Sequence, residues 1–125
     1  MCLTTKNKKT KRISIGYKVL YKTTDGGYRS PMHHYAETYT LNELYTEKSR
    51  RKLGWPYYLT GFHIYKHKSG AEFMLNGPLD YNFTYPRGSL VICKVECKNI
   101  CASGTQDGQE VVVARKMRVV EELKW

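Results

Sequence analysis

Carboxylates are scarce in this chain, and its first 24 residues contain none. Asp and Glu number 11 among 125 residues, whereas Lys and Arg number 21, so the formal net charge is +10. Five cations stand within the first 12 residues: Lys6, Lys8, Lys9, Lys11 and Arg12. A positive field attracts polyanions and speeds their capture. The composition therefore predicts an anionic partner.

Long hydrophobic runs are also missing. No apolar run approaches the ~20 residues that a membrane-spanning helix needs. The N-terminal cations are not followed by the apolar segment of a secretory signal. We therefore expect a cytoplasmic protein without membrane contact, and in that compartment its four cysteines should be reduced.

The sequence lacks the local signatures of several enzyme classes. It has no nucleophile elbow and no glycine-rich phosphate loop. Residues 103–108 contain only two glycines and predict a hairpin turn instead. We predict no catalytic residue and no cofactor, while an active site assembled from distant residues stays an alternative.

Cysteine and histidine occur at regular spacings. Cys93, Cys97 and Cys101 are four apart, which is compatible with zinc binding if Cys2 or a histidine supplies a fourth ligand. However, Cys93 and Cys97 alternate with charged residues on a predicted strand, where free cysteine behaves as a small hydrophobe. On a strand, His63 and His67 would be ~13 Å apart. We therefore expect core cysteines and no metal site.

Hydrophobic periodicity predicts the secondary structure. Alternation of apolar and polar residues indicates strands, and runs of β-branched residues indicate a central strand. A helix is expected from Asn42, a plausible N-cap, to Gly54, and a second short helix near 69–75. A turn at 24–27 leads to a return strand at 28–30, and residues 116–123 fit either a strand or a short helix. The main predicted strands are 13–22, 57–65, 90–98 and 110–115.

These elements predict a single α+β domain over residues 13–125, preceded by a flexible basic tail over residues 1–12. Its fold should be a small, strongly bent antiparallel sheet or partial barrel with one or two short helices. A loop of 13 residues, 76–88, is long enough to suggest a functional role. The predicted core consists of Ile15, Tyr17, Val19, Leu44, Phe62, Ile64, Phe73, Val91, Cys93, Val95, Val111 and Val113.

Cations and aromatic residues are interleaved in three groups: the tail, residues 48–52 and residues 66–68. Of the 16 aromatic residues, 11 are tyrosine, which combines a flat apolar ring with a polar tip. Such a mixture suits single-stranded nucleic acid, whose phosphates pair with cations while its bases stack on rings. The cations expected to contact phosphates are Lys8, Lys9, Lys11, Arg12, Arg50, Arg51, Lys52 and Lys66. The residues expected to stack or anchor are Tyr57, Tyr58 and Tyr65. His63 is expected on the same strand face as Tyr65 and His67. The alternative is a solvated face on a basic protein.

Short segments over most of the chain are similar to one group of proteins. They are Met-Cys-Leu at 1–3 with lysines after it, Tyr-Lys-Val-Leu at 17–20, Arg-Ser-Pro at 29–31, Gly-Phe-His at 61–63, the strand at 91–95 and residues 112–117. Together they resemble small uncharacterised accessory proteins of tailed phages and prophages. The resemblance implies a role against host defence in the host cytoplasm. Such proteins include inhibitors of CRISPR effectors and sponges for signalling nucleotides.

Charge and resemblance together predict a non-enzymatic protein that binds RNA, or an RNA-guided defence complex, through a basic, Tyr-rich surface. One alternative is a pocket for a small anionic signalling nucleotide. A further alternative is a small nucleotide-directed enzyme, because the order of strand, Gly-Phe-His and helix also resembles compact ADP-ribosyltransferase-like folds. For that family the catalytic pattern is incomplete, since only Glu121 and Glu122 are late candidates.

Overall fold

The computed structural model describes residues 3, 5–7, 10, 12–30, 38–48, 52–53, 58–76 and 89–123, and only the backbone at 52–53. Most of this part of the chain is antiparallel sheet. The strands are β1 (Thr5–Lys6), β2 (Ile15–Lys22), β3 (Tyr28–Arg29), β4 (Leu44–Thr46), β5 (Lys52–Leu53), β6 (Tyr58–Leu59), β7 (Phe62–Tyr65), β8 (Leu90–Gln106) and β9 (Gln109–Leu123). The helix α1 spans Lys68–Asn76. The expected α+β class with a strongly bent antiparallel sheet is confirmed.

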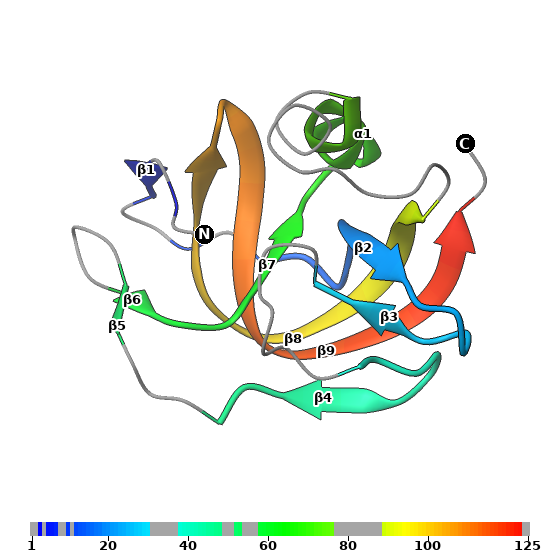
Figure 1. Cartoon of the computed structure of the whole chain (residues 1–125). Coiled ribbons are helices and arrows are strands. Elements are labelled where there is room, and N and C mark those ends of the chain that lie inside the picture. Colours follow the sequence, from blue (N-terminus) through cyan, green and yellow to red (C-terminus); the bar gives the residue numbers. More distant parts are fainter. Residues whose placement is uncertain are drawn as a thin grey trace.

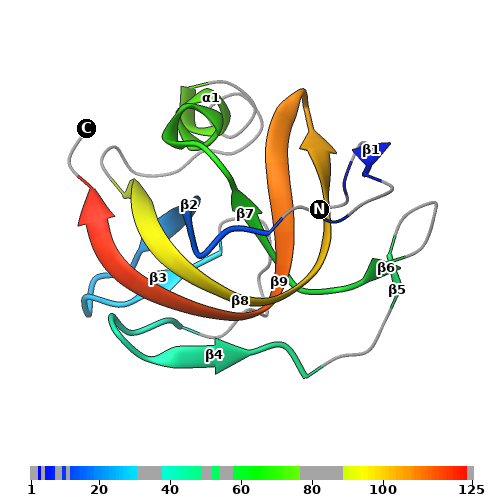
Figure 2. The same cartoon turned by 180° about the vertical axis from the view of Figure 1, so that it is seen from behind.

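The long strands β8 and β9 organise the molecule. They form a hairpin that bends into a trough, with α1 above the trough and β4 below it (Figures 1 and 2). The strand order is β1-β8-β2-β7-β9-β4, and β8 also pairs with β9. Strands β8, β2, β7 and β9 therefore form a closed ring of hydrogen bonds around the largest apolar cluster.

The register of the β8–β9 hairpin changes twice along its length. A two-residue turn at Asp107 and Gly108, both with positive φ, pairs Gln106 with Gln109. Between Ile100 and Ala102 the register shifts by one residue, so Cys101 is an extra residue in β8. A second shift between Lys94 and Val95 restores the original register. Such bulges bend a strand and increase its twist, which explains the trough.

Two large apolar clusters hold the fold, and a smaller third one contains Tyr58, Ala102 and Val113. Inside the ring lie side chains from every ring strand, including Leu20, Ile64, Val95 and Met117, all fully buried. The second cluster lies under α1 and contains Val19, Tyr65, Ala71, Met74, Leu75, Ile92 and Val111. Cys93 and Cys97 are buried as free thiols, which confirms the prediction of core cysteines. Burial raises the pKa of each of these two thiols to about 12.

Several strand boundaries differ from the prediction. The strand expected over 57–65 is interrupted at Thr60–Gly61 and divides into β6 and β7. The strand expected at 90–98 continues to Gln106, so the predicted turn at 103–108 is limited to two residues. Residues 116–123 are strand, one of the two forms expected. The short helix near 69–75 is confirmed as α1, and most of the loop at 76–88 lies outside the described residues.

The prediction of a helix that starts after Asn42 is wrong. Asn42 lies in a turn with φ of 67°, and the residues that follow form β4. Three residues of β4 pair with Lys116–Arg118 of β9, and β5 forms part of a separate two-stranded sheet. Pairing with a long neighbouring strand outweighs the weak helical spacing of this segment, because propensity alone contributes only tenths of a kcal/mol per residue.

Three residues expected in the core are exposed: Ile15, Leu44 and Phe73. The side of β2 with Gly16, Lys18 and Leu20, not the side with Ile15, lines the ring. Leu44 lies on an edge strand. Phe73 lies on α1 opposite the helix side buried by Ala71 and Met74.

Part of the predicted tail forms a short strand. Thr5 and Lys6 form β1, which pairs with Thr105 and Gly104 at the far end of β8. The Asn7 amide donates a hydrogen bond to the Ser103 carbonyl at 2.8 Å. The N-terminal residues therefore extend the sheet in this region.

Candidate nucleic-acid interface

Many of the predicted site residues lie where the structure does not describe them. Outside the described residues are Lys8, Lys9, Lys11, Arg50, Arg51 and Tyr57. Lys52 is described only through its backbone, in β5. The predicted contacts of these residues with phosphates and bases stay predictions.

Tyr58 and His63 come together, but not as an open stacking surface. Tyr58 is buried, and its hydroxyl lies 3.2 Å from His63 Nε2 and accepts a hydrogen bond from the Leu3 amide at 2.8 Å. The two rings meet edge to face with centroids 6.1 Å apart. This contact ties the start of the chain to β7, and Tyr58 offers no free ring face to a base.

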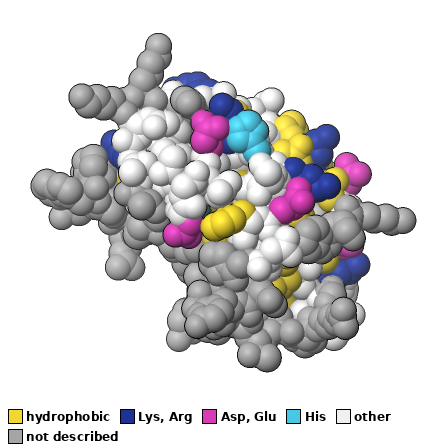
Figure 3. Space-filling view, turned by 90° about the horizontal axis from the view of Figure 1, so that it is seen from above, with side chains coloured by type: hydrophobic (Ala, Val, Ile, Leu, Met, Phe, Trp, Pro, Cys, Tyr) yellow, Lys and Arg dark blue, Asp and Glu magenta, His cyan; other side chains and the backbone are white. Residues whose placement is uncertain are grey.

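Tyr65 and Lys66 also occupy settings that the sequence did not predict. Tyr65 is buried beneath α1, where burial raises the pKa of its hydroxyl. Lys66 Nζ lies 3.8 Å from Glu110, whose other oxygen is 2.9 Å from His67 Nε2. On the side of the molecule seen from above, acidic, basic and hydrophobic side chains are interspersed (Figure 3). Tyr65 as placed cannot stack on a base, and Lys66 already has an acidic neighbour.

A coherent group of cations lies on the opposite side, along the bend of β8 and β9. We call it the basic face and define it by Lys94, Lys98, Lys116 and Arg118. Cross-strand pairing places Lys98 opposite Lys116, and Glu96 opposite Arg118. Side chains of directly paired residues project from the same side of an antiparallel sheet. Because Val95, Cys97 and Met117 fill the inside of the ring, these charged residues face outward.

Few carboxylates balance the basic face. Glu96 is shared, since one of its oxygens is 3.5 Å from Arg118 Nη2 and 3.9 Å from Lys98 Nζ. Lys116 has no ion pair within the described residues, and the same holds for Lys94, although Glu121 is its direct cross-strand partner. Like charges placed directly opposite each other destabilise a sheet. The Lys98–Lys116 pair is therefore not explained by a contribution to the stability of the sheet.

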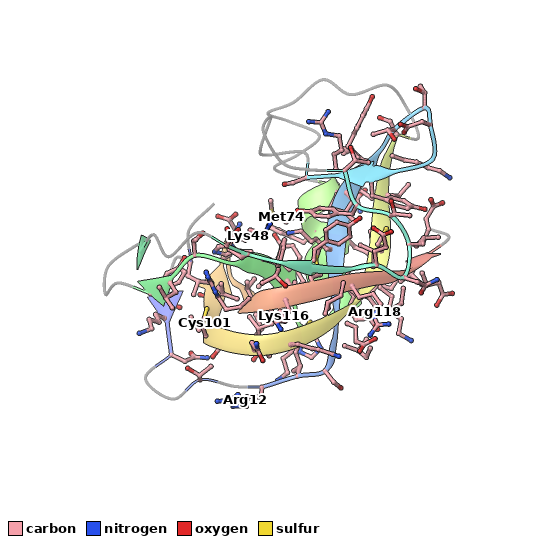
Figure 4. All side chains as sticks on the ribbon, turned by 90° about the horizontal axis from the view of Figure 1, so that it is seen from below. Arg12, Lys48, Met74, Cys101, Lys116 and Arg118 are labelled. Atoms are coloured by element: carbon pink, nitrogen blue, oxygen red, sulfur yellow. The ribbon has the colours of Figure 1, made fainter. Side chains whose placement is uncertain are left out.

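Further cations flank the basic face. Figure 4 looks at the bend from below and shows Lys116 and Arg118 on β9, with Arg12 across β8 and Lys48 beyond the other side. Arg12 is exposed just before β2, and Lys48 is exposed just after β4. Of the two predicted phosphate contacts whose side chains the structure describes, Arg12 and Lys66, Arg12 lies next to this face.

The charge alternation of two strands is the signal in the sequence that points to the basic face. Lys94, Glu96 and Lys98 share one polar strand face, and Lys116 and Arg118 follow the same alternation. None of these four cations is among the predicted phosphate contacts, because the alternation does not show that the two strands are paired. If the register set by the turn continued along the whole hairpin, Lys98 would pair with Met117. The bulge at Cys101 shifts the register by one residue and brings Lys98 opposite Lys116.

Lys18 is a different kind of cation, because it is partly buried on the side of β2 that lines the ring. Its Nζ donates a hydrogen bond to the His63 carbonyl at 2.8 Å. Burial lowers the pKa of Lys18 to about 8, while the nearby Cys97 acts in the opposite direction. The alternation in the sequence places Lys18 on the polar side of its strand, whereas this side of β2 faces the interior.

Other kinds of site find little support in the described residues. Within them, no group of three or more His, Cys, Asp or Glu side chains is arranged to hold a metal ion. None of them forms a helix with the length and apolar character that crossing a membrane requires. Cys101, the bulged residue, is partly buried with its thiol 3.4 Å from the Leu59 carbonyl, and burial raises its pKa.

Comparison of the chain with protein-family models, with curated proteins and with solved structures finds no match in any of the three. The function is therefore inferred from the residues and geometry of the basic face.

Proposed function

We propose that this protein is a non-enzymatic binding protein for RNA, free or exposed in an RNA-guided defence complex, and that RNA docks on the basic face. The observation that carries the proposal is the direct pairing of Lys98 with Lys116 on the outward side of the two longest strands. Phosphate groups would relieve the repulsion between these cations, and release of counterions from the RNA would favour binding. The resemblance to phage accessory proteins supports the role against host defence.

The geometry supports a broad contact and not a single-ion site. Residues on the same side of a strand recur about every 7 Å and neighbouring strands lie about 4.8 Å apart, so the four cations spread over several phosphate positions. Lys98 is 47% exposed in its side chain, and Arg118 is 33% exposed. Part of each side chain is therefore accessible to a polyanion that lies along the bend, while Arg118 Nε itself is buried.

The test is the salt dependence of RNA binding, measured by fluorescence anisotropy with a labelled single-stranded oligonucleotide. In the double variant Lys98→Gln/Lys116→Gln, we expect weaker binding. We also expect the slope of log K against log salt to decrease in magnitude by about 1.4, which is roughly 0.7 for each phosphate contact. Equal loss in a control that removes two cations elsewhere would refute the proposal.

The matched control is Lys6→Gln/Lys68→Gln, which changes the net charge by the same amount away from the basic face. Its slope should remain close to that of the natural protein. Tight binding of a mononucleotide with little salt dependence would instead support the alternative of a small-nucleotide pocket.

A further inference from the structure

The basic face contains two neighbouring cross-strand rows of side chains that differ in chemical character. One cross-strand row runs Ile15, Glu96, Arg118 and Leu44 over β2, β8, β9 and β4. The next row toward the bend contains Lys98, Lys116 and Thr46. The first row therefore has an ion pair between two apolar ends, whereas the second is cationic and polar.

The apolar ends of the first row are open to solvent. Ile15 is 37% exposed and Leu44 is 46% exposed, so both side chains have apolar surface without protein cover. Between them, Arg118 is partly held by Glu96. A guanidinium plane and aliphatic side chains can contact the flat faces of bases, and the carboxylate and guanidinium can bond to base edges.

A double helix cannot use both rows. Its bases are stacked and paired inside, so it would present phosphates to Lys98 and Lys116 but leave Ile15 and Leu44 uncovered. A single strand exposes phosphates along one side and base faces along the other. The distance between two rows on one sheet face is about 7 Å, which allows the backbone and the bases to occupy neighbouring rows.

We propose that the basic face selects single-stranded RNA, with phosphates along the Lys98–Lys116 row and bases against Ile15, Arg118 and Leu44. This inference rests on the proposed function, because it assumes that RNA docks on this face. The cations provide affinity for any nucleic acid, while the apolar row distinguishes unpaired from paired strands.

The experiment compares one RNA sequence as a single strand and as a blunt duplex at the same salt concentration. We expect the single strand to bind roughly tenfold more tightly, in keeping with the energy of one base contact. In Ile15→Ser/Leu44→Ser this preference should disappear through loss of single-strand affinity, while duplex affinity stays unchanged. Both side chains are exposed, and thermal unfolding verifies that the variant folds.

The matched control is Phe73→Ser, which removes an exposed apolar side chain from α1, away from the basic face. It should leave the preference intact. Equal binding of single strand and duplex by the natural protein, or an unchanged preference in Ile15→Ser/Leu44→Ser, would overturn this inference while leaving RNA binding in place. Failure to bind either RNA would instead overturn the proposed function.

Discussion

The Lys18 side chain adds a hydrogen bond between β2 and β7, two strands of the ring. Strands β2 and β7 pair at one position, Tyr17 with Tyr65. Beside this position, the Lys18 amine donates to the His63 carbonyl, so a side chain supplies a bond across the two strands. The bond keeps a partly buried carbonyl satisfied, but it places a cation in an apolar interior, which disfavours the charged form.

The low pKa of Lys18 predicts that its contribution to stability depends on pH. With a folded-state pKa of about 8, against 10.5 as the ordinary value, the unfolded chain holds more protons between these values, so stability rises with pH in this window. From pH 7 to pH 9.5, Lys18 should add up to about 2 kcal/mol to the free energy of unfolding. Urea unfolding at both pH values gives the increase in the free energy of unfolding with pH. The contribution of Lys18 is the increase in the natural protein minus the increase in Lys18→Met.

A second lysine provides the control for this measurement. Lys68→Met removes an exposed cation at the start of α1, so its stability should follow that of the natural protein at both pH values. If Lys18→Met gains as much stability with pH as the natural protein does, the titration of Lys18 is not the cause.

At the scale of elements, the bulge at Cys101 decides which side chains of β8 face inward. On the turn side of the bulge, Ala102 pairs with Val113; beyond it, Ile100 pairs with Ala114 and Lys98 with Lys116. If Cys101 paired with Ala114 instead of bulging, Lys98 would pair with Met117, which is fully buried. One residue therefore keeps the lysines outside and the apolar side chains inside.

Deletion of Cys101 should destabilise the bent hairpin more than replacement of Cys101 does. The deletion would keep Ile100 opposite Ala114 and Lys98 opposite Lys116, but it would remove the bulge and the bend that the bulge produces. Cys101→Ala keeps the register and loses only a partly buried thiol. Far-UV circular dichroism with thermal melting compares the two, and a cooperative transition of the deletion variant near that of Cys101→Ala would contradict this account.

At the scale of the whole molecule, the net charge of +10 is distributed over several regions. The basic face holds four cations, and three of the lysines predicted to contact phosphates, Lys8, Lys9 and Lys11, precede β2 in the sequence. We expect these two groups to bind RNA differently. The basic face has apolar residues beside its cations and can contact bases, whereas Lys8, Lys9 and Lys11 have no apolar neighbours in the sequence.

Replacing Lys8, Lys9 and Lys11 with Gln should reduce the salt slope of RNA binding by about 2, in line with roughly 0.7 for each phosphate contact. The loss should be the same for single-stranded and duplex RNA, so the preference for single strands remains. Anisotropy titrations at several salt concentrations measure both quantities. An unchanged slope would show that these lysines do not contact phosphate, and a lost preference would place base contacts in the N-terminal segment.

Several features of the fold can be predicted from local patterns. Alternation identifies β2, the beginning of β8 and its buried cysteines, because period two and side-chain polarity are visible in a single strand. The composition of residues 69–75 predicts the helix α1. The wrong prediction at β4 has a tertiary cause, since three residues of weak helical spacing become strand only by pairing with β9.

The sequence by itself determined the sign of the charge, the antiparallel α+β class and the identity of the apolar strands, because these follow from composition and short-range periodicity. The tertiary structure alone decided which face of β2 is inside, that Tyr58 and Tyr65 are buried, and that Lys98 meets Lys116. These outcomes depend on strand pairing between residues far apart in the chain, and on a bulge whose one-residue shift reverses the faces of a strand.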